Sequence, residues 1–217
     1  TQARDHAARC VKWLRDGAPG RIILDVVEAD GLWPLLEQYG DGREVLPDAA
    51  VMHTALKDLD KPGNVDADLK KAIDEYDAAG FVLRYNKLAQ VRRAVGDDFV
   101  LGDMVSIEKS KYDPDTKAYS KKVRVVLNLK SSKISAATRM RHKIEFPRAT
   151  DVVKNMLNMM AEVKPGEVIV QLVVDIANAF WNIPNHPMER RFFVTKVGSD
   201  WIVFLRTAQG SRNAMLT

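Results

Sequence analysis

Asp175 is the residue with the clearest capacity for chemistry, because it directly follows a run of apolar residues. Residues 168–174 read Val-Ile-Val-Gln-Leu-Val-Val, which predicts a strand covered on both faces. A carboxylate at the tip of a core strand is unfavourable unless a metal ion or hydrogen-bond donors compensate it. Asp175 is therefore a candidate metal ligand, and the alternative is a strand-end aspartate that caps a turn.

Two further motifs follow Asp175, and a basic hairpin precedes it. The segment from Ile176 reads Ile-Ala-Asn-Ala-Phe-Trp-Asn-Ile-Pro, and Gln209-Gly210 follows a predicted strand at 201–205. Residues 105–109 and 123–130 predict two strands of a hairpin, joined by a polar loop at 110–122. Alternation along such a strand places evenly spaced side chains on one face, and we expect this of Lys122, Arg124 and Lys130.

Positive charge gathers around this hairpin. Residues 101–154 contain 13 Lys/Arg and 6 Asp/Glu, a net charge of +7, whereas residues 1–100 have −4 and residues 155–217 have +1. A basic block between two nearly neutral ones indicates a phosphate-binding surface. The alternative is a solvated basic face.

Residues 101–217 resemble the fingers and palm of a reverse transcriptase, closest to the polymerases of retrotransposons and retrovirus-like elements. The resemblance rests on the run VVDIANAFWNIPNHPMERRFF, on Gln209-Gly210, and on the hairpin with its arginine, all in the order of that family. The sequence departs from the family at Asn128 and Lys130, where Asp and Arg are usual. It also has Ser135 where Asn is more usual.

The resemblance implies nucleotidyl transfer with two Mg²⁺ ions, which stabilise the entering and leaving oxygens. It assigns Asp175 as the catalytic carboxylate and metal ligand, with the Ile176 carbonyl as a second oxygen. Backbone N–H groups near Asn178 and Ala179 would hold phosphate oxygens. Phe180 would select deoxynucleotides by colliding with a 2′-hydroxyl; the alternative is a core phenylalanine beside Trp181.

Further roles follow from the same resemblance. Arg124 would lie against the incoming nucleotide, and either Lys109 or Lys111 would meet its triphosphate. Gln209 would touch the sugar or the template, and Gly210 would allow close backbone approach. Arg148 is either a template contact or a surface cation. The full set of expected nucleic-acid contacts is Lys122, Lys130, Arg148, Arg206 and Arg212.

Helical patterns flank these motifs. We predict helices at 2–15, ending at Gly17; from Asp66 to Gly80; at 86–95, capped by Asn86; and at 151–161, capped by Thr150. A strand at 81–85 lies between the second and the third. The methionines of the last helix are expected in the core. Glu189-Arg190-Arg191 is typical of the family, or else only a helix-surface ion pair. Residues 21–27 fit a strand or a helical turn, and 57–64 a loop.

The sequence therefore predicts an α+β protein: an N-terminal region, residues 1–65, partly helical, and fingers with a partial palm, residues 66–217, built on an antiparallel sheet. The family's second aspartate motif lies beyond Thr217, so we expect an inactive fragment of an RNA-directed DNA polymerase from a polyprotein. Its partners would be an RNA/DNA template–primer and deoxynucleoside triphosphates, in an intracellular setting, cytoplasmic or nuclear. Oligomeric state and accompanying RNase H or integrase stay open. The alternatives are a catalytically dead nucleic-acid-binding remnant and a protein-interaction domain.

The sequence contains neither a candidate membrane span nor a pair of cysteines. No apolar run approaches the roughly 20 residues of a membrane span, so no membrane partner is expected. Cys10 is the single cysteine, which excludes an internal disulfide and a cysteine metal cluster. We expect it reduced, on an apolar helix face.

Overall fold

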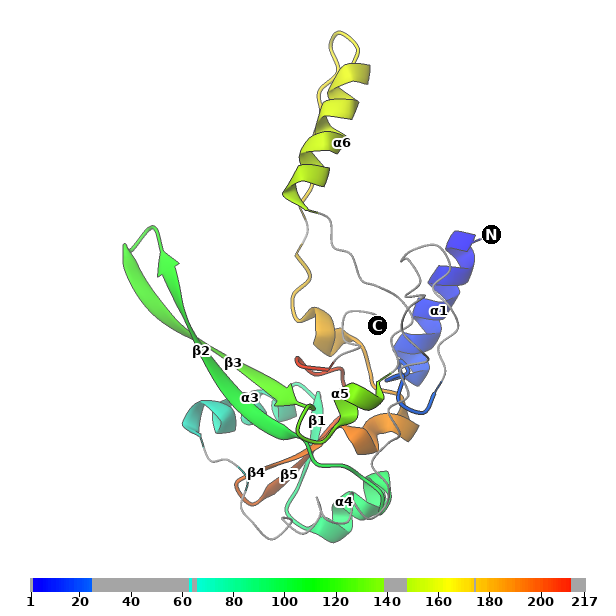
Figure 1. Ribbon diagram of the computed structural model, residues 1–217, viewed down its shortest axis with the longest axis vertical. Coiled ribbons are helices and arrows are strands. Elements are labelled where there is room, and N and C mark those ends of the chain that lie inside the picture. The colour runs from blue at the N-terminus through cyan, green and yellow to red at the C-terminus, as the bar shows by residue number, and fades with distance from the viewer. Residues whose placement is uncertain (1, 25–62, 64–65, 139–147, 174, 212–217) are drawn as a thin grey trace.

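The computed structural model describes residues 2–24, 63, 66–138, 148–173 and 175–211 (Figure 1). The first element is helix α1, Gln2–Asp16, as predicted. It ends at Gly17, whose positive φ of 96° suits glycine, and whose Cβ position is only 2.6 Å from the backbone of His186. Cys10 on this helix is exposed. Val11 and Leu14 are also exposed, and neither belongs to a buried cluster of the described residues.

A three-stranded antiparallel sheet in the order β1-β5-β4 forms the centre of the molecule. Its strands are β1, Val82–Tyr85; β4, Val194–Val197; and β5, Asp200–Phe204. Helix α3, Ala67–Ala78, buries Leu69 and Ile73 in the same core as β1 and β5. Helix α4, Leu88–Val95, buries Val91 in a second cluster with Val203 and Trp201. The first strand and the helix before it are confirmed as predicted.

The helix caps agree with the sequence in one case and differ in another. The side chain of Asp66 accepts a hydrogen bond from Asp68 N at 3.0 Å, and Gly80 follows α3 with a φ of 70°. The prediction that Asn86 caps α4 is wrong. Lys87 occupies the cap position, where its N–H donates to Gln90 Oε1 at 3.2 Å. The Gln90 side chain thus reaches back to the cap residue, as the third helical residue does in a capping box.

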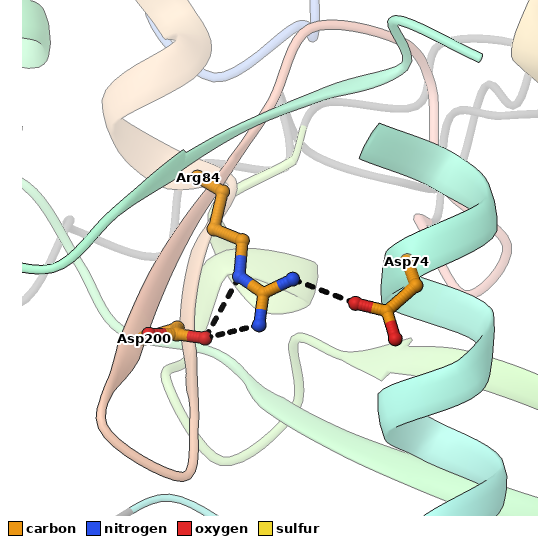
Figure 2. Close-up of polar contacts among 3 residues, drawn as sticks. All are labelled: Asp74, Arg84 and Asp200. Carbon is orange, nitrogen blue, oxygen red and sulfur yellow. Dashed lines mark hydrogen bonds and ion pairs between the residues drawn. The ribbon is translucent and has the colours of Figure 1, made fainter. Parts of the chain in front are cut away.

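An ion-pair network joins α3 to the central sheet. Arg84 of β1 donates through Nε to Asp200 Oδ2 at 2.7 Å and through Nη1 to Asp74 Oδ1 at 2.6 Å. Figure 2 shows the guanidinium group between the two carboxylates. These hydrogen bonds raise the pKa of Arg84. The side chain therefore links a strand, a helix and the β4–β5 turn at one point.

A long antiparallel ribbon extends from the body. It consists of β2, Asp103–Asp113, and β3, Ala118–Asn128, paired from Asp103↔Asn128 to Asp113↔Ala118. We call this pair the ribbon. The predicted hairpin is confirmed, but the predicted loop at 110–122 is wrong, because pairing continues until only residues 114–117 remain unpaired. Lys130 lies beyond the end of β3, so it does not share a strand face with Arg124.

Residues 148–173 form an arm that stands away from the body (Figure 1). The arm consists of helix α6, Ala149–Glu162, and a returning segment without regular secondary structure. Three predictions about it are wrong. Arg148, not Thr150, is the helix N-cap; no residue of α6 is buried, so its methionines are not core; and residues 168–173 are not a buried strand. Val168, Val170, Leu172 and Val173 are each more than 80% exposed.

Residues 168–173 have no pairing strand among the described residues, which explains why the predicted strand is not found there. Apolar β-branched residues predict a strand only where a neighbouring strand can pair with them. Within the described part of the chain, no backbone hydrogen bond involves residues 168–173.

Short helical turns and the N-terminal segment complete the body. These turns are α5, Ile134–Ala137; the 3₁₀ helix η2, Ala179–Asn182; and the 3₁₀ helix η3, Pro187–Phe192. Residues 21–24 form bends, neither strand nor helix, and the loop predicted at 57–64 lies outside the described residues except for Gly63. The prediction of an α+β fold with antiparallel sheet is confirmed. No helix in the described ranges is long and apolar enough to cross a membrane.

Glu189 of η3 anchors the N-terminal segment and is not the surface ion-pair residue that the sequence allowed. Its side chain is fully buried. Its carboxylate accepts hydrogen bonds from the N–H groups of Gly20, of Ile22 at 2.9 Å, of Ile23 at 2.7 Å and of Leu24 at 3.0 Å. A buried carboxylate is stable only with such donors.

Candidate functional site

A groove of about 650 Å³ lies between α3, strand β3 and the segments around η2 and Gln209. Such a volume is typical of small-molecule sites. The residues that line it are Asp68, Lys71, Ala72, Glu75, Tyr76, Lys121, Val123, Arg124, Val125, Asn178, Trp181 and Gln209. Three of them, Arg124, Asn178 and Gln209, belong to the nucleotide-binding set expected from the sequence. They come from three separate parts of the chain.

Gln209 reaches the groove because its segment is held against β3. Its carbonyl oxygen accepts a hydrogen bond from Leu127 N at 2.9 Å. The next residue, Gly210, has a φ of 101°, and a Cβ atom there would overlap the Leu127 carbonyl oxygen. The expected close backbone approach at Gly210 is therefore present, and its partner is strand β3. Ser211 beside it is buried.

Aromatic rings form the apolar floor of the groove. The Trp181 ring lies 4.3 Å from that of Tyr76, stacks on Phe81 at 5.2 Å and lies 6.0 Å from Phe204, as measured between centroids. Burial raises the pKa of the Tyr76 hydroxyl. Tyr76 and Trp181 were not predicted from the sequence as residues that line a groove. Their signal was the helical spacing of Tyr76 after Ile73, which predicts a core face but not a groove.

Charged side chains from α3 and β3 meet at the rim. Lys121 Nζ lies 2.6 Å from Glu108 Oε1 and 3.1 Å from Asp68 Oδ2. These two carboxylates raise the pKa of Lys121. Next to them, Asp66 accepts a hydrogen bond from Ser106 Oγ, which lowers the pKa of that carboxyl. Polar contacts of this kind hold the ribbon against the first turn of α3.

The ribbon divides its basic residues between two faces. Lys109, Lys111 and Arg124 share one face because they alternate with the residues that pack on α3, and Lys109 is paired with Lys122 by register. Lys109 and Lys111 are exposed and do not line the groove. Arg124 alone of the three reaches its edge. Lys130 is exposed after the strand, where its N–H donates to Asn128 Oδ1 at 3.1 Å.

The segment before η2 carries the other expected site residues. Asn178 lies in the left-handed region, with a φ of 54°, and its carbonyl oxygen accepts from Trp181 N at 2.8 Å. Asn178 and Ala179 are exposed, and Phe180 is half-buried. Of this segment, Asn178 and Trp181 line the groove, whereas Ala179 and Phe180 do not. The structure thus brings one of the three expected residues into the groove.

Asp175 does not lie at the tip of a core strand. It is exposed, as is Ile176, and neither lines the groove. Among the residues that the structure describes, no group of three or more His, Cys, Asp or Glu side chains could hold a metal ion. A site for two Mg²⁺ ions needs several hard oxygen ligands, so the metal site expected at Asp175 and Ile176 stays a prediction.

The remaining expected nucleic-acid contacts are scattered. Arg148 is exposed at the start of α6, where its N–H donates to Asp151 Oδ2 at 2.8 Å. Arg206 is half-buried, and its Nη1 donates to the Asn182 carbonyl at 3.4 Å. Burial and the nearby charge of Arg206 lower the pKa of Arg190. Arg212 lies outside the described residues.

Comparison of the chain with protein-family models, with curated proteins and with solved structures gave no match.

Proposed function

We propose that the chain is the fingers and part of the palm of an RNA-directed DNA polymerase of a retrotransposon-like polyprotein, and that its groove binds the incoming deoxynucleotide. One observation carries this proposal. Arg124, Asn178 and Gln209 were assigned to the nucleotide from three separate motifs, and all three line one groove. Residues taken from separate parts of the chain without regard to nucleotide binding would not be expected to line the same groove.

The groove has the chemistry that a nucleotide requires. The planar guanidinium of Arg124 can stack on a base and donate hydrogen bonds at once. Lys71 adds positive charge for phosphate, whereas Lys121 is paired with Asp68 and Glu108 at the rim. Trp181 and Tyr76 supply the apolar surface against which a sugar or base can pack. Gln209 supplies an amide that both donates and accepts.

Polymerisation in this family uses two Mg²⁺ ions, which polarise the reacting phosphate, and Asp175 with the Ile176 carbonyl would give one part of their ligand set. We propose Phe180 as the residue that selects deoxynucleotides, next to the groove residue Trp181. Lys109 or Lys111 would meet the triphosphate of the incoming nucleotide. The residues proposed to contact phosphates of the template–primer are Lys122, Lys130, Arg148, Arg206 and Arg212.

Fluorescence anisotropy with a labelled RNA/DNA template–primer tests this proposal. The chain should bind the duplex at low salt, and a deoxynucleoside triphosphate should tighten the complex. Arg124→Ala and Gln209→Ala should each weaken the nucleotide effect by about tenfold, the usual range for a hydrogen bond to a charged group. Arg93→Ala, an exposed cation on α4, is the matched control. No duplex binding at low salt would overturn the proposal.

A nucleic-acid-binding remnant without catalysis is the second candidate. The exposed position of Asp175, outside the groove, favours it. Salt dependence does not separate the two, since both need phosphate contacts. Primer extension by the encoded polyprotein does. Extension that is lost with Asp175→Asn supports the polymerase, and duplex binding without any extension supports the remnant.

A further inference from the structure

Two tyrosines lie side by side near the outer end of the ribbon. Tyr112 and Tyr119 are directly opposed in the register, with ring centroids 5.2 Å apart and an interplanar angle of 57°. Tyr119 is 74% exposed and Tyr112 is 49% exposed. Packing of one ring on the other stabilises the end of a ribbon. That contact leaves most of the surface of Tyr119 open to a ligand.

The tyrosines continue the surface of the groove. Side chains that alternate along a strand share a face, so Tyr119 lies on the same face of β3 as Lys121, Val123 and Val125. The last three line the groove. At about 3.3 Å per residue, the six steps from Val125 to Tyr119 span roughly 20 Å. One face of the ribbon therefore leads from the groove to the aromatic pair.

The ribbon also has the charge that a nucleic acid requires. Residues 106–124 contain six Lys/Arg and three Asp/Glu, a net charge of +3. Lys109 and Lys111 are on the opposite face from the tyrosines. The thickness of a sheet with its side chains, about 10 Å, is close to the Debye length of about 8 Å at physiological salt, so the potential of these lysines reaches the tyrosine face in weakened form. Aromatic rings within a positive surface are the usual platform for single-stranded nucleic acid.

We propose that Tyr119, supported by Tyr112, is a stacking platform for an unpaired base of single-stranded nucleic acid that leaves the groove along the ribbon. This inference rests on the proposed function, and it adds a second binding site, at Tyr119, for the single-stranded part of the template. Stacking tolerates every base, because each has a π-face. The platform would therefore bind the unpaired part of a template without regard to its sequence.

The test uses the full chain and two RNA/DNA template–primers that differ only in the template end, one blunt and one with a single-stranded 5′ extension. The wild-type chain should bind the extended duplex more tightly. Tyr119→Ala should lower this preference by about tenfold, the usual contribution of one stacked base. Tyr119→Phe, which keeps the ring, should retain the preference. Lys109→Ala should weaken both duplexes to a similar extent.

A second variant separates stacking from ribbon stability. Tyr119→Val keeps a good strand former but removes the ring, and hydrogen exchange of the ribbon amides checks that the pairing survives. With the ribbon intact, loss of the preference supports the platform. An unchanged preference with Tyr119→Val, or equal binding of the two duplexes by the wild-type chain, overturns the platform and leaves the groove proposal standing. Failure to bind either duplex overturns both.

Discussion

The body and the arm contain similar apolar patterns with opposite exposure. In the body, Trp181, Phe204 and Ile202 are buried where α3, the central sheet and η2 meet. In the arm, Leu157, Met160 and Leu172 are at least 60% exposed. The periodicity of α6 is that of a buried helix, and the composition of 168–174 is that of a buried strand. The spacing of apolar residues therefore indicates which side chains can be buried, whereas burial itself requires another apolar surface for them to pack against.

Removing Trp181 should have the largest effect on stability and would test the difference in burial between the body and the arm. Trp181→Ala should lower the free energy of unfolding by about 3–5 kcal/mol, because the ring packs among Tyr76, Phe81 and Phe204. Met160→Ala in the arm is the control and should change it by less than about 0.5 kcal/mol. Urea unfolding followed by circular dichroism measures both. Equal losses in the free energy of unfolding for the two substitutions would contradict the difference in burial between the body and the arm.

Two glycines with positive φ give the next test. Gly210→Ala should cost about 2–4 kcal/mol, because the new methyl group would overlap the Leu127 carbonyl in addition to the backbone strain. Gly166 in the arm has a φ of 91° but open space around its Cβ position. Gly166→Ala should cost only about 1–2 kcal/mol, the strain alone. Thermal unfolding compares them, and a smaller loss for Gly210→Ala contradicts the packing of Gly210 on β3.

Acid should loosen the contact between the ribbon and α3. The hydrogen bond from Ser106 lowers the pKa of Asp66. A depressed carboxyl pKa adds stability above the ordinary value near 4, and this stability is lost as the pH falls through the folded-state pKa. Asp66→Asn and Ser106→Ala should therefore both flatten the fall in stability below about pH 4. Unfolding midpoints measured from pH 3 to 7 test this, and an unchanged profile in both variants would exclude the contact.

Charge in the arm should have the smallest effect on stability. Val170→Lys with Leu172→Lys should change the free energy of unfolding by less than about 0.5 kcal/mol, since both side chains are more than 80% exposed. The same substitutions should reduce self-association, because lysine in an exposed apolar segment opposes strand pairing between two copies of the chain. Light scattering at several concentrations measures this. A large loss of stability would show that the segment is buried in solution.

Local signals in the sequence predicted much of the fold. The helix from Asp66, the strand at 81–85, the hairpin and the stop at Gly17 were all predicted, because a capping carboxylate, alternating residues and a glycine act within a few positions. The predicted loop of the hairpin was too long because its tip, rich in Lys, Ser and Asp, resembles a loop. Strand pairing with a partner overrides that composition.

Long-range features were not predictable in the same way. The sequence named Arg124, Asn178 and Gln209 through motifs, and all three lie in the groove. Their neighbours Tyr76 and Lys121 were missed, because no local pattern shows which helix face borders an open space. The burial of Glu189 is not predictable from its neighbours in sequence, since its donors at residues 20–24 are more than 160 positions away in the chain. Asp175 was placed on a strand for which the described residues supply no partner.

The carboxylate of Glu189 also sets an order of events during synthesis. Gly20, Ile22, Ile23 and Leu24 leave the ribosome 165 to 169 residues before their shared acceptor. At about 5–20 residues per second, this separation corresponds to a delay of roughly 10–30 s. During that interval the N-terminal segment is a nascent chain whose native acceptor does not yet exist.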